Sequence, residues 1–224
     1  MYLTDLLNFL SEIPVYIIFI FLCLVLSLVS LAKKNPPRYL PLFTCYLFLT
    51  LIIECIGWSY KRAAMNNLTL YNLYGVVHFT YVIYLLSSFL QEGRARHIFT
   101  WIMLFYPIAA LLNIYIIQGP RHFGTYSYIV GAVIVVICSI YYFYQRIKFP
   151  GRESLLLDPS FWIATGLLFF NAITVPYLGI VNFVANIPHA DKTFSTINAV
   201  LTIILYSLFC ISSVCSLNFR KLPS

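Results

Sequence analysis

Apolar residues are gathered into seven long runs, and short polar segments separate each run from the next. A helix needs roughly 20 residues to cross the hydrocarbon of a bilayer, and each run is about that long. The pattern predicts an all-α membrane protein, a bundle of seven transmembrane helices over residues 13–32, 39–60, 70–91, 97–117, 124–145, 160–183 and 193–217. We expect residues 1–224 to form a single transmembrane domain, because the links are too short for a soluble one.

Composition agrees with this prediction. The chain is 61% hydrophobic and 9% charged, whereas soluble domains carry about 25% charged residues. We therefore expect a polytopic integral membrane protein, surrounded by the lipid bilayer, in a bacterial inner (cytoplasmic) membrane. The net charge of +7 does not predict nucleic-acid binding, because Lys and Arg in a membrane protein mainly set its orientation.

Basic residues divide unevenly between the two sets of links. Positive charge favours the cytoplasmic side of a membrane. One set holds Lys33, Lys34, Arg38, Arg94, Arg96, Arg146, Lys148, Arg152, Arg220 and Lys221, and the other holds Lys61, Arg62, Arg121 and Lys192. The sequence therefore predicts that the N-terminus lies outside and the C-terminus inside.

Motifs of the common membrane cofactors are missing from the sequence. The lysine nearest the last run, Lys192, precedes it, so a retinal Schiff base is not expected. His97, His122 and His189 fall in links, which leaves His78 without a second histidine at membrane depth to hold a haem. The six cysteines lie within the runs and form no CxxC motif. We expect no cofactor and no metal site, and an enzyme is not the favoured class.

Two ionisable residues, Glu54 and His78, lie well inside predicted spans. Such residues are costly to insert and are functional candidates by default. Counting 1.5 Å per helical residue places Glu54 roughly 9 Å and His78 roughly 12 Å from the outer surface. Because their spans are consecutive and antiparallel, we expect the two side chains to be in contact and to offset each other's desolvation.

Further polar side chains fall in the outer half of other spans. In the third span, Tyr74 and Tyr81 share a helical face with His78. The predicted ligand-binding residues are Glu54, His78, Tyr74, Tyr81, Asn113, Asn171, Thr174, Tyr177, Asn198 and Thr202. Helix packing is the competing interpretation, because small polar residues and buried amides commonly join membrane helices. Packing is the favoured reading for Thr202, and the two readings stay balanced for Asn171 and Asn198.

The leading functional hypothesis is a receptor-like or sensor protein that binds a small or amphipathic ligand in an outward-facing polar cavity. With no predicted output domain, its signal would need a protein partner at the basic inner surface. A proton-coupled carrier or channel, in which Glu54 loads and releases a proton, is the first alternative. An intramembrane lipid-modifying enzyme with Glu54 and His78 as acid and base is the second. A structural subunit of a membrane complex is the third.

Three apolar segments contain short polar insertions: LIIECIGW in the second run, TLYNLYGVVHF in the third, and DPSFWIATGLLFF at the start of the sixth. In these segments and in its layout, the whole chain resembles a loose group of uncharacterised seven-span membrane proteins common in Bacteroidota. The resemblance implies a seven-span fold. It implies no activity, and it transfers no site residue and no substrate.

Overall fold

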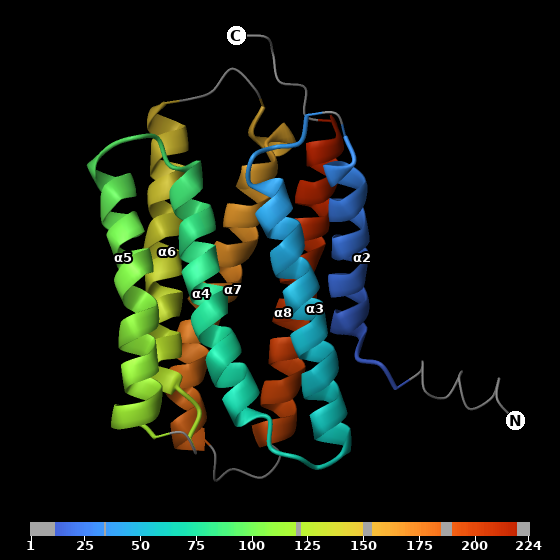
Figure 1. Ribbon diagram of the computed structural model, residues 1–224, viewed down its shortest axis with the longest axis vertical. Helices are drawn as coiled ribbons and strands as arrows, with labels where there is room; N and C mark the ends of the chain where they lie inside the picture. Colours follow the sequence, from blue (N-terminus) through green and yellow to red (C-terminus); the bar gives the residue numbers. More distant parts are fainter. Residues whose placement is uncertain (1–11, 34, 120–121, 150–153, 185–189, 219–224) are drawn as a thin grey trace, which may run out of the picture.

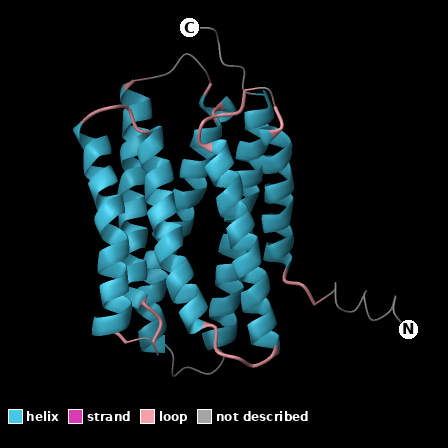
Figure 2. Ribbon diagram, viewed as in Figure 1, coloured by secondary structure: helices cyan, strands magenta, loops and turns pink. Residues whose placement is uncertain are grey.

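The computed structural model describes residues 12–33, 35–119, 122–149, 154–184 and 190–218, and it is a bundle of helices (Figures 1 and 2). Side chains of residues 180–194 are outside the description. The long helices are α2 (Val15–Leu31), α3 (Leu40–Arg62), α4 (Leu68–Phe89), α5 (Arg94–Leu112), α6 (Thr125–Lys148), α7 (Pro159–Val184) and α8 (Ala190–Asn218). A π-helical turn, η1 (Asn113–Ile117), extends α5, and a short 3-10 turn, η2 (Leu155–Leu157), precedes α7.

A helix lies over each of the seven predicted ranges, and the all-helical class is confirmed over the described residues. Five of the helices are long and apolar enough to cross a membrane, namely Leu40–Arg62, Arg94–Ile117, Thr125–Lys148, Pro159–Gly179 and Ser195–Leu217. The helix α2 is apolar but has only 17 residues. Many large apolar side chains point outward and are exposed, among them Phe105, Ile116 and Phe169. Such a surface suits contact with lipid and not with water, which makes the chain an integral membrane protein.

Six of the helices form a closed ring, and the seventh packs on its outside. Around the ring, α2 packs between α3 and α8, α7 packs between α8 and α6, and α4 packs on α6. The ring closes through a sparser contact between α3 and α4, while α5 lies against the outer side of α4 (Figure 1). Sparse backbone contact between α3 and α4 leaves room in the middle of the bundle, which large aromatic side chains fill in part.

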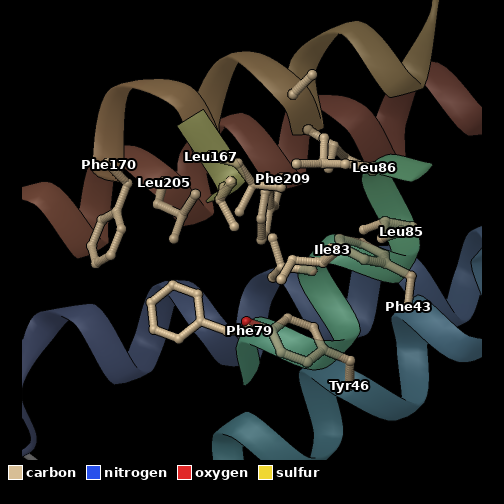
Figure 3. Close-up of a cluster of buried hydrophobic side chains, with 14 of the residues drawn as sticks. Phe43, Tyr46, Phe79, Ile83, Leu85, Leu86, Leu167, Phe170, Leu205 and Phe209 are labelled. Carbon is tan, nitrogen blue, oxygen red and sulfur yellow. The ribbon is translucent and has the colours of Figure 1, made fainter. Parts of the chain in front are cut away.

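Large apolar side chains fill the half of the bundle where α3 and α7 begin. Figure 3 shows Phe43, Ile83, Leu86, Leu167 and Phe209 converging from α3, α4, α7 and α8, and all five are almost fully buried. The rings of Phe43 and Phe209 meet edge to face, with 5.3 Å between centroids. Buried aromatic pairs of this kind contribute about 0.5–1.5 kcal/mol beyond their buried area. We call this cluster the apolar plug.

An ion pair ties α6 to α7 at the same end of the bundle. Arg146 of α6 pairs with Asp158, which is 8% exposed and lies directly before α7. Asp158 also caps α7, because its Oδ1 accepts a hydrogen bond from the Ser160 amide at 3.0 Å. Proline follows at the first helical position, Pro159, where its missing N–H costs nothing. The DPSFW segment is therefore a helix start with a built-in link to the preceding helix.

Candidate ligand-binding cavity

A cavity of about 380 Å³ lies between α3, α4, α6, α7 and α8, in the half of the bundle where α3 ends and α4 begins. Tyrosines and phenylalanines make up seven of its sixteen described lining residues. Seven of the ten residues predicted from the sequence line it, namely Glu54, Tyr74, His78, Thr174, Tyr177, Asn198 and Thr202. The prediction that polar groups from several helices gather in one half of the bundle therefore agrees with the geometry. Whether they bind a ligand stays a prediction.

Glu54 is half-buried on the cavity wall, where a tyrosine holds its carboxylate. The Tyr71 hydroxyl donates a hydrogen bond to Glu54 Oε2 at 3.1 Å. Gly57, one turn further along α3, makes this bond possible. A Cβ at Gly57 would lie 2.2 Å from the Tyr71 hydroxyl, so any larger residue would push the phenol away from Glu54.

The expected contact between Glu54 and His78 is not formed. His78 Nδ1 is instead 2.8 Å from the hydroxyl of Tyr46, and the described residues contain no ion pair between the two side chains. A buried polar group needs a hydrogen-bond partner. The Tyr46 hydroxyl is that partner for one ring nitrogen of His78, so no charged partner is needed there. The prediction of a Glu54–His78 pair is therefore wrong at the level of direct contact.

The register between α3 and α4 explains the error. Three hydrogen bonds join the helices like rungs: Glu54 with Tyr71, Thr50 with Tyr74 at 2.8 Å, and Tyr46 with His78. Glu54 and His78 thus belong to the first and third rungs. Successive rungs are about one helical turn apart, so Glu54 and His78 are separated by roughly 11 Å along the helices. They face the same cavity from different depths.

Three of the predicted residues lie away from the cavity. Asn113 begins the π-helical turn η1 and donates hydrogen bonds to Gln118 Oε1 at 2.7 Å and Ser127 Oγ at 3.2 Å. Asn171 is fully buried, and its amide nitrogen donates to the carbonyl of Leu167 at 2.8 Å. Asn113 therefore links η1 to α6, whereas the Asn171 bond stays within α7 and leaves its buried Oδ1 without a hydrogen-bond partner among the described residues.

Tyr81 is the third residue outside the cavity. Its ring stacks on Tyr46 with 4.5 Å between centroids, and this leaves its buried hydroxyl without a hydrogen-bond partner among the described residues. It shares a helical face with His78, as predicted, but lies almost a turn deeper. Tyr81 therefore supports the ring that holds His78 and does not reach the cavity itself.

Sequence reasoning missed most of the aromatic wall, including Tyr71, Tyr128 and Tyr206. A signal existed for two of them. Tyr71 precedes Tyr74 by three residues, and Tyr206 follows Thr202 by four, so each shares a face with a predicted residue. Tyr128 on α6 gave no such signal, because that helix contributed no other candidate.

A second, larger hollow of about 770 Å³ adjoins the cavity and runs between α2, α3 and α8. We call it the side groove. Its walls include Glu12, Lys61 and Arg62, and Arg62 pairs with Glu12 at 2.8 Å. Glu54 and Tyr71 line both the groove and the cavity. Their hydrogen bond therefore stands at the boundary between the two spaces.

One carboxylate, one imidazole and several phenols face the cavity. Among the described residues, no serine or threonine is hydrogen-bonded to His78, whose Nδ1 meets the Tyr46 hydroxyl. Within the described residues, no three His, Cys, Asp or Glu side chains are grouped to hold a metal ion. No family model, curated protein or solved structure matches this chain.

Proposed function

We propose that this chain is a receptor-like or sensor membrane protein that binds a small ligand in the cavity between α3, α4, α6, α7 and α8. The observation that carries the proposal is the cavity itself. Its volume of about 380 Å³ falls within the range of about 300–1,000 Å³ that small-molecule sites occupy. Its walls combine aromatic rings with a few convergent polar groups, which is the usual make-up of such sites.

The apolar plug favours binding over transport. Directly beneath the cavity, the next turns of α4, α7 and α8 contribute the plug residues Ile83, Leu167 and Phe209, each at most 1% exposed (Figure 3). A carrier or channel would need polar groups or water along its path through the bilayer. A closed floor of large apolar side chains is what a ligand pocket needs, because it ends the site and excludes water.

We further propose that all seven helices cross the bilayer, with the cavity facing outward and the C-terminus inside. Figure 1 places the first residues of α2 and the last of α8 at opposite ends, as an odd number of spans requires. Arg38, Arg94, Arg96 and Lys148 lie at the ends of helices on the proposed inner side. This basic surface is where a protein partner would receive the signal.

Ligand-dependent stabilisation tests the proposal. The purified protein in nanodiscs would be screened by thermal unfolding against small metabolites and amphiphiles. A ligand at 100 times its Kd stabilises the native state by about 2.7 kcal/mol. We expect at least one compound to raise the unfolding midpoint in the wild type and in Val77→Leu, whose residue lies exposed on the outer face of α4.

The same compound should have no effect on Gly75→Leu. Gly75 lines the cavity, and the nearest atom to an added Cβ is 4.0 Å away, so a leucine enters the empty space. Stabilisation that survives Gly75→Leu would place the ligand elsewhere. A library without a single stabilising compound would contradict the binding function.

A further inference from the structure

Charge is distributed asymmetrically around the cavity. Among the described residues that line it, Glu54 is the one side chain with a formal charge at neutral pH, and none of them is a lysine or an arginine. In the described part of the chain, no cation pairs with Glu54. Two basic residues, Lys61 and Arg62, line the side groove instead, where Arg62 pairs with Glu12. Within the described ranges, the Glu54 carboxylate therefore has no paired counterion.

Aromatic rings make up the largest group of the remaining lining residues. Five tyrosines and two phenylalanines line the same cavity, namely Tyr71, Tyr74, Tyr128, Tyr177, Tyr206, Phe123 and Phe170. The face of an aromatic ring carries partial negative charge and attracts a cation, more strongly when the site is shielded from water. Rings and carboxylate therefore favour the same kind of ligand, and both disfavour an anion.

We propose that the cavity binds a small organic cation, an amine or quaternary ammonium with apolar substituents, with Glu54 as its counterion and the tyrosine rings as its walls. The inference rests on the proposed binding function and names its ligand class. An inorganic ion fits less well, because hard cations need six or more oxygen ligands and the cavity supplies one carboxylate. An alkylammonium ion needs no such shell and gains from contact with rings on several sides.

The side groove gives the ligand a way to the acid. Glu54 and Tyr71 line both spaces, so a cation in the groove meets the carboxylate before it enters the cavity. Because the groove runs between α2, α3 and α8, an alkylammonium group could come from a free amine or from the headgroup of a zwitterionic lipid. The two sources share one recognition chemistry, and the experiment separates them.

Three probes of nearly equal shape test the charge directly. Choline, its neutral carbon isostere 3,3-dimethylbutan-1-ol, and the anion 3,3-dimethylbutyrate would be titrated into the wild type by calorimetry in a lipid-free detergent. We expect choline to bind at least tenfold more tightly than the neutral isostere and the anion not to bind. Glu54→Gln should remove the preference, and Glu54→Asp should retain it. Glu92→Gln, which removes an exposed acid outside the cavity, is the matched control.

The outcomes separate this inference from the function on which it rests. Equal or tighter binding of the neutral probe or the anion would overturn the cation assignment and leave the binding function standing. If none of the three binds, the cation assignment falls, and the broad library decides the binding function. A choline preference that persists in Glu54→Gln would also overturn the role of Glu54. Finally, displacement of choline by phosphatidylcholine but not phosphatidylglycerol would identify a lipid headgroup as the source, and a lack of displacement would identify a free amine.

Discussion

The close approach of α3 to Tyr71 makes Gly57→Ala a direct test of how Glu54 is held. The added methyl carbon would lie 2.2 Å from the Tyr71 hydroxyl oxygen, 2.7 Å from Cζ and 3.1 Å from Cε2. Ordinary contacts between such atoms are about 3.5–4.0 Å. The phenol must therefore move by more than about 1 Å at its tip, and since that tip donates the 3.1 Å hydrogen bond to Glu54, the bond is lost.

The expected free-energy change combines two opposing effects. Overpacking a close contact costs about 1–3 kcal/mol, while Gly→Ala inside a helix gains about 1 kcal/mol. We therefore expect Gly57→Ala to destabilise the protein by about 0–2 kcal/mol. In a Tyr71→Leu background, which removes the ring atoms of the clash, the same substitution should stabilise it by about 1 kcal/mol. The sign should change between the two backgrounds.

Thermal and denaturant unfolding of the four proteins in one detergent measures this double-mutant cycle. The coupling energy between positions 57 and 71 should be about 1–3 kcal/mol. Gly75→Ala is the control, because no atom lies closer than 4.0 Å to its new Cβ and the helix gain should appear alone. If Gly57→Ala stabilises the wild type as much as it stabilises the Tyr71→Leu variant, Tyr71 does not lie over Gly57 and the described hold on Glu54 is refuted.

Further substitutions test the packing of the bundle and its orientation in the membrane. Gly131→Ala on α6 would place a methyl 2.6 Å from Cγ of Phe79, an atom too close to the backbone to swing away, so we expect a loss of about 1–3 kcal/mol or more in unfolding free energy. Asp158→Ala removes both the cap of α7 and the partner of Arg146. Because Arg146 is partly exposed, we expect the free energy of unfolding to fall by about 1–3 kcal/mol. Asp158→Asn can still cap the helix, so it should lower the free energy of unfolding by less. Cysteine labelling tests the orientation in the membrane. Lys61→Cys should react with a membrane-impermeant maleimide on intact cells, and Arg94→Cys should react only after lysis. The reverse pattern would contradict the prediction that the N-terminus lies outside.

Helix positions were predictable because hydrophobic run length depends on local sequence alone. A run of about 20 apolar residues has few other structures available in a bilayer. The ends differ by a few residues: the predicted span 39–60 is Leu40–Arg62, and 97–117 is Arg94–Ile117 with its π-helical turn. Sequence periodicity also placed seven polar candidates on cavity-facing sides. Both predictions depend on the sequence of one helix at a time.

Contacts between helices were not predictable in the same way. The depth estimate compared only the backbone positions of Glu54 and His78 along their helices. Which side chains meet also depends on how far each one extends from its backbone. Tyrosine extends far from its backbone, so Tyr71 reaches Glu54 and Tyr46 reaches His78 across the α3–α4 contact. Nothing in the spacing of polar residues specifies the offset between the two helices.

The position of the acid in LIIECIGW follows from this ladder. Glu54 occupies the rung nearest the side groove, Gly57 leaves room for the phenol that holds it, and Thr50 and Tyr46 continue the ladder inward with neutral groups. An acid one rung deeper would replace Thr50, which is 1% exposed, and the burial of its charge would cost more. The ladder thus places the carboxylate at the boundary between the side groove and the cavity and keeps uncharged groups beside the apolar plug. This arrangement supports the proposed cation site, because such a site needs attraction at its entrance, aromatic rings in its walls and an apolar floor.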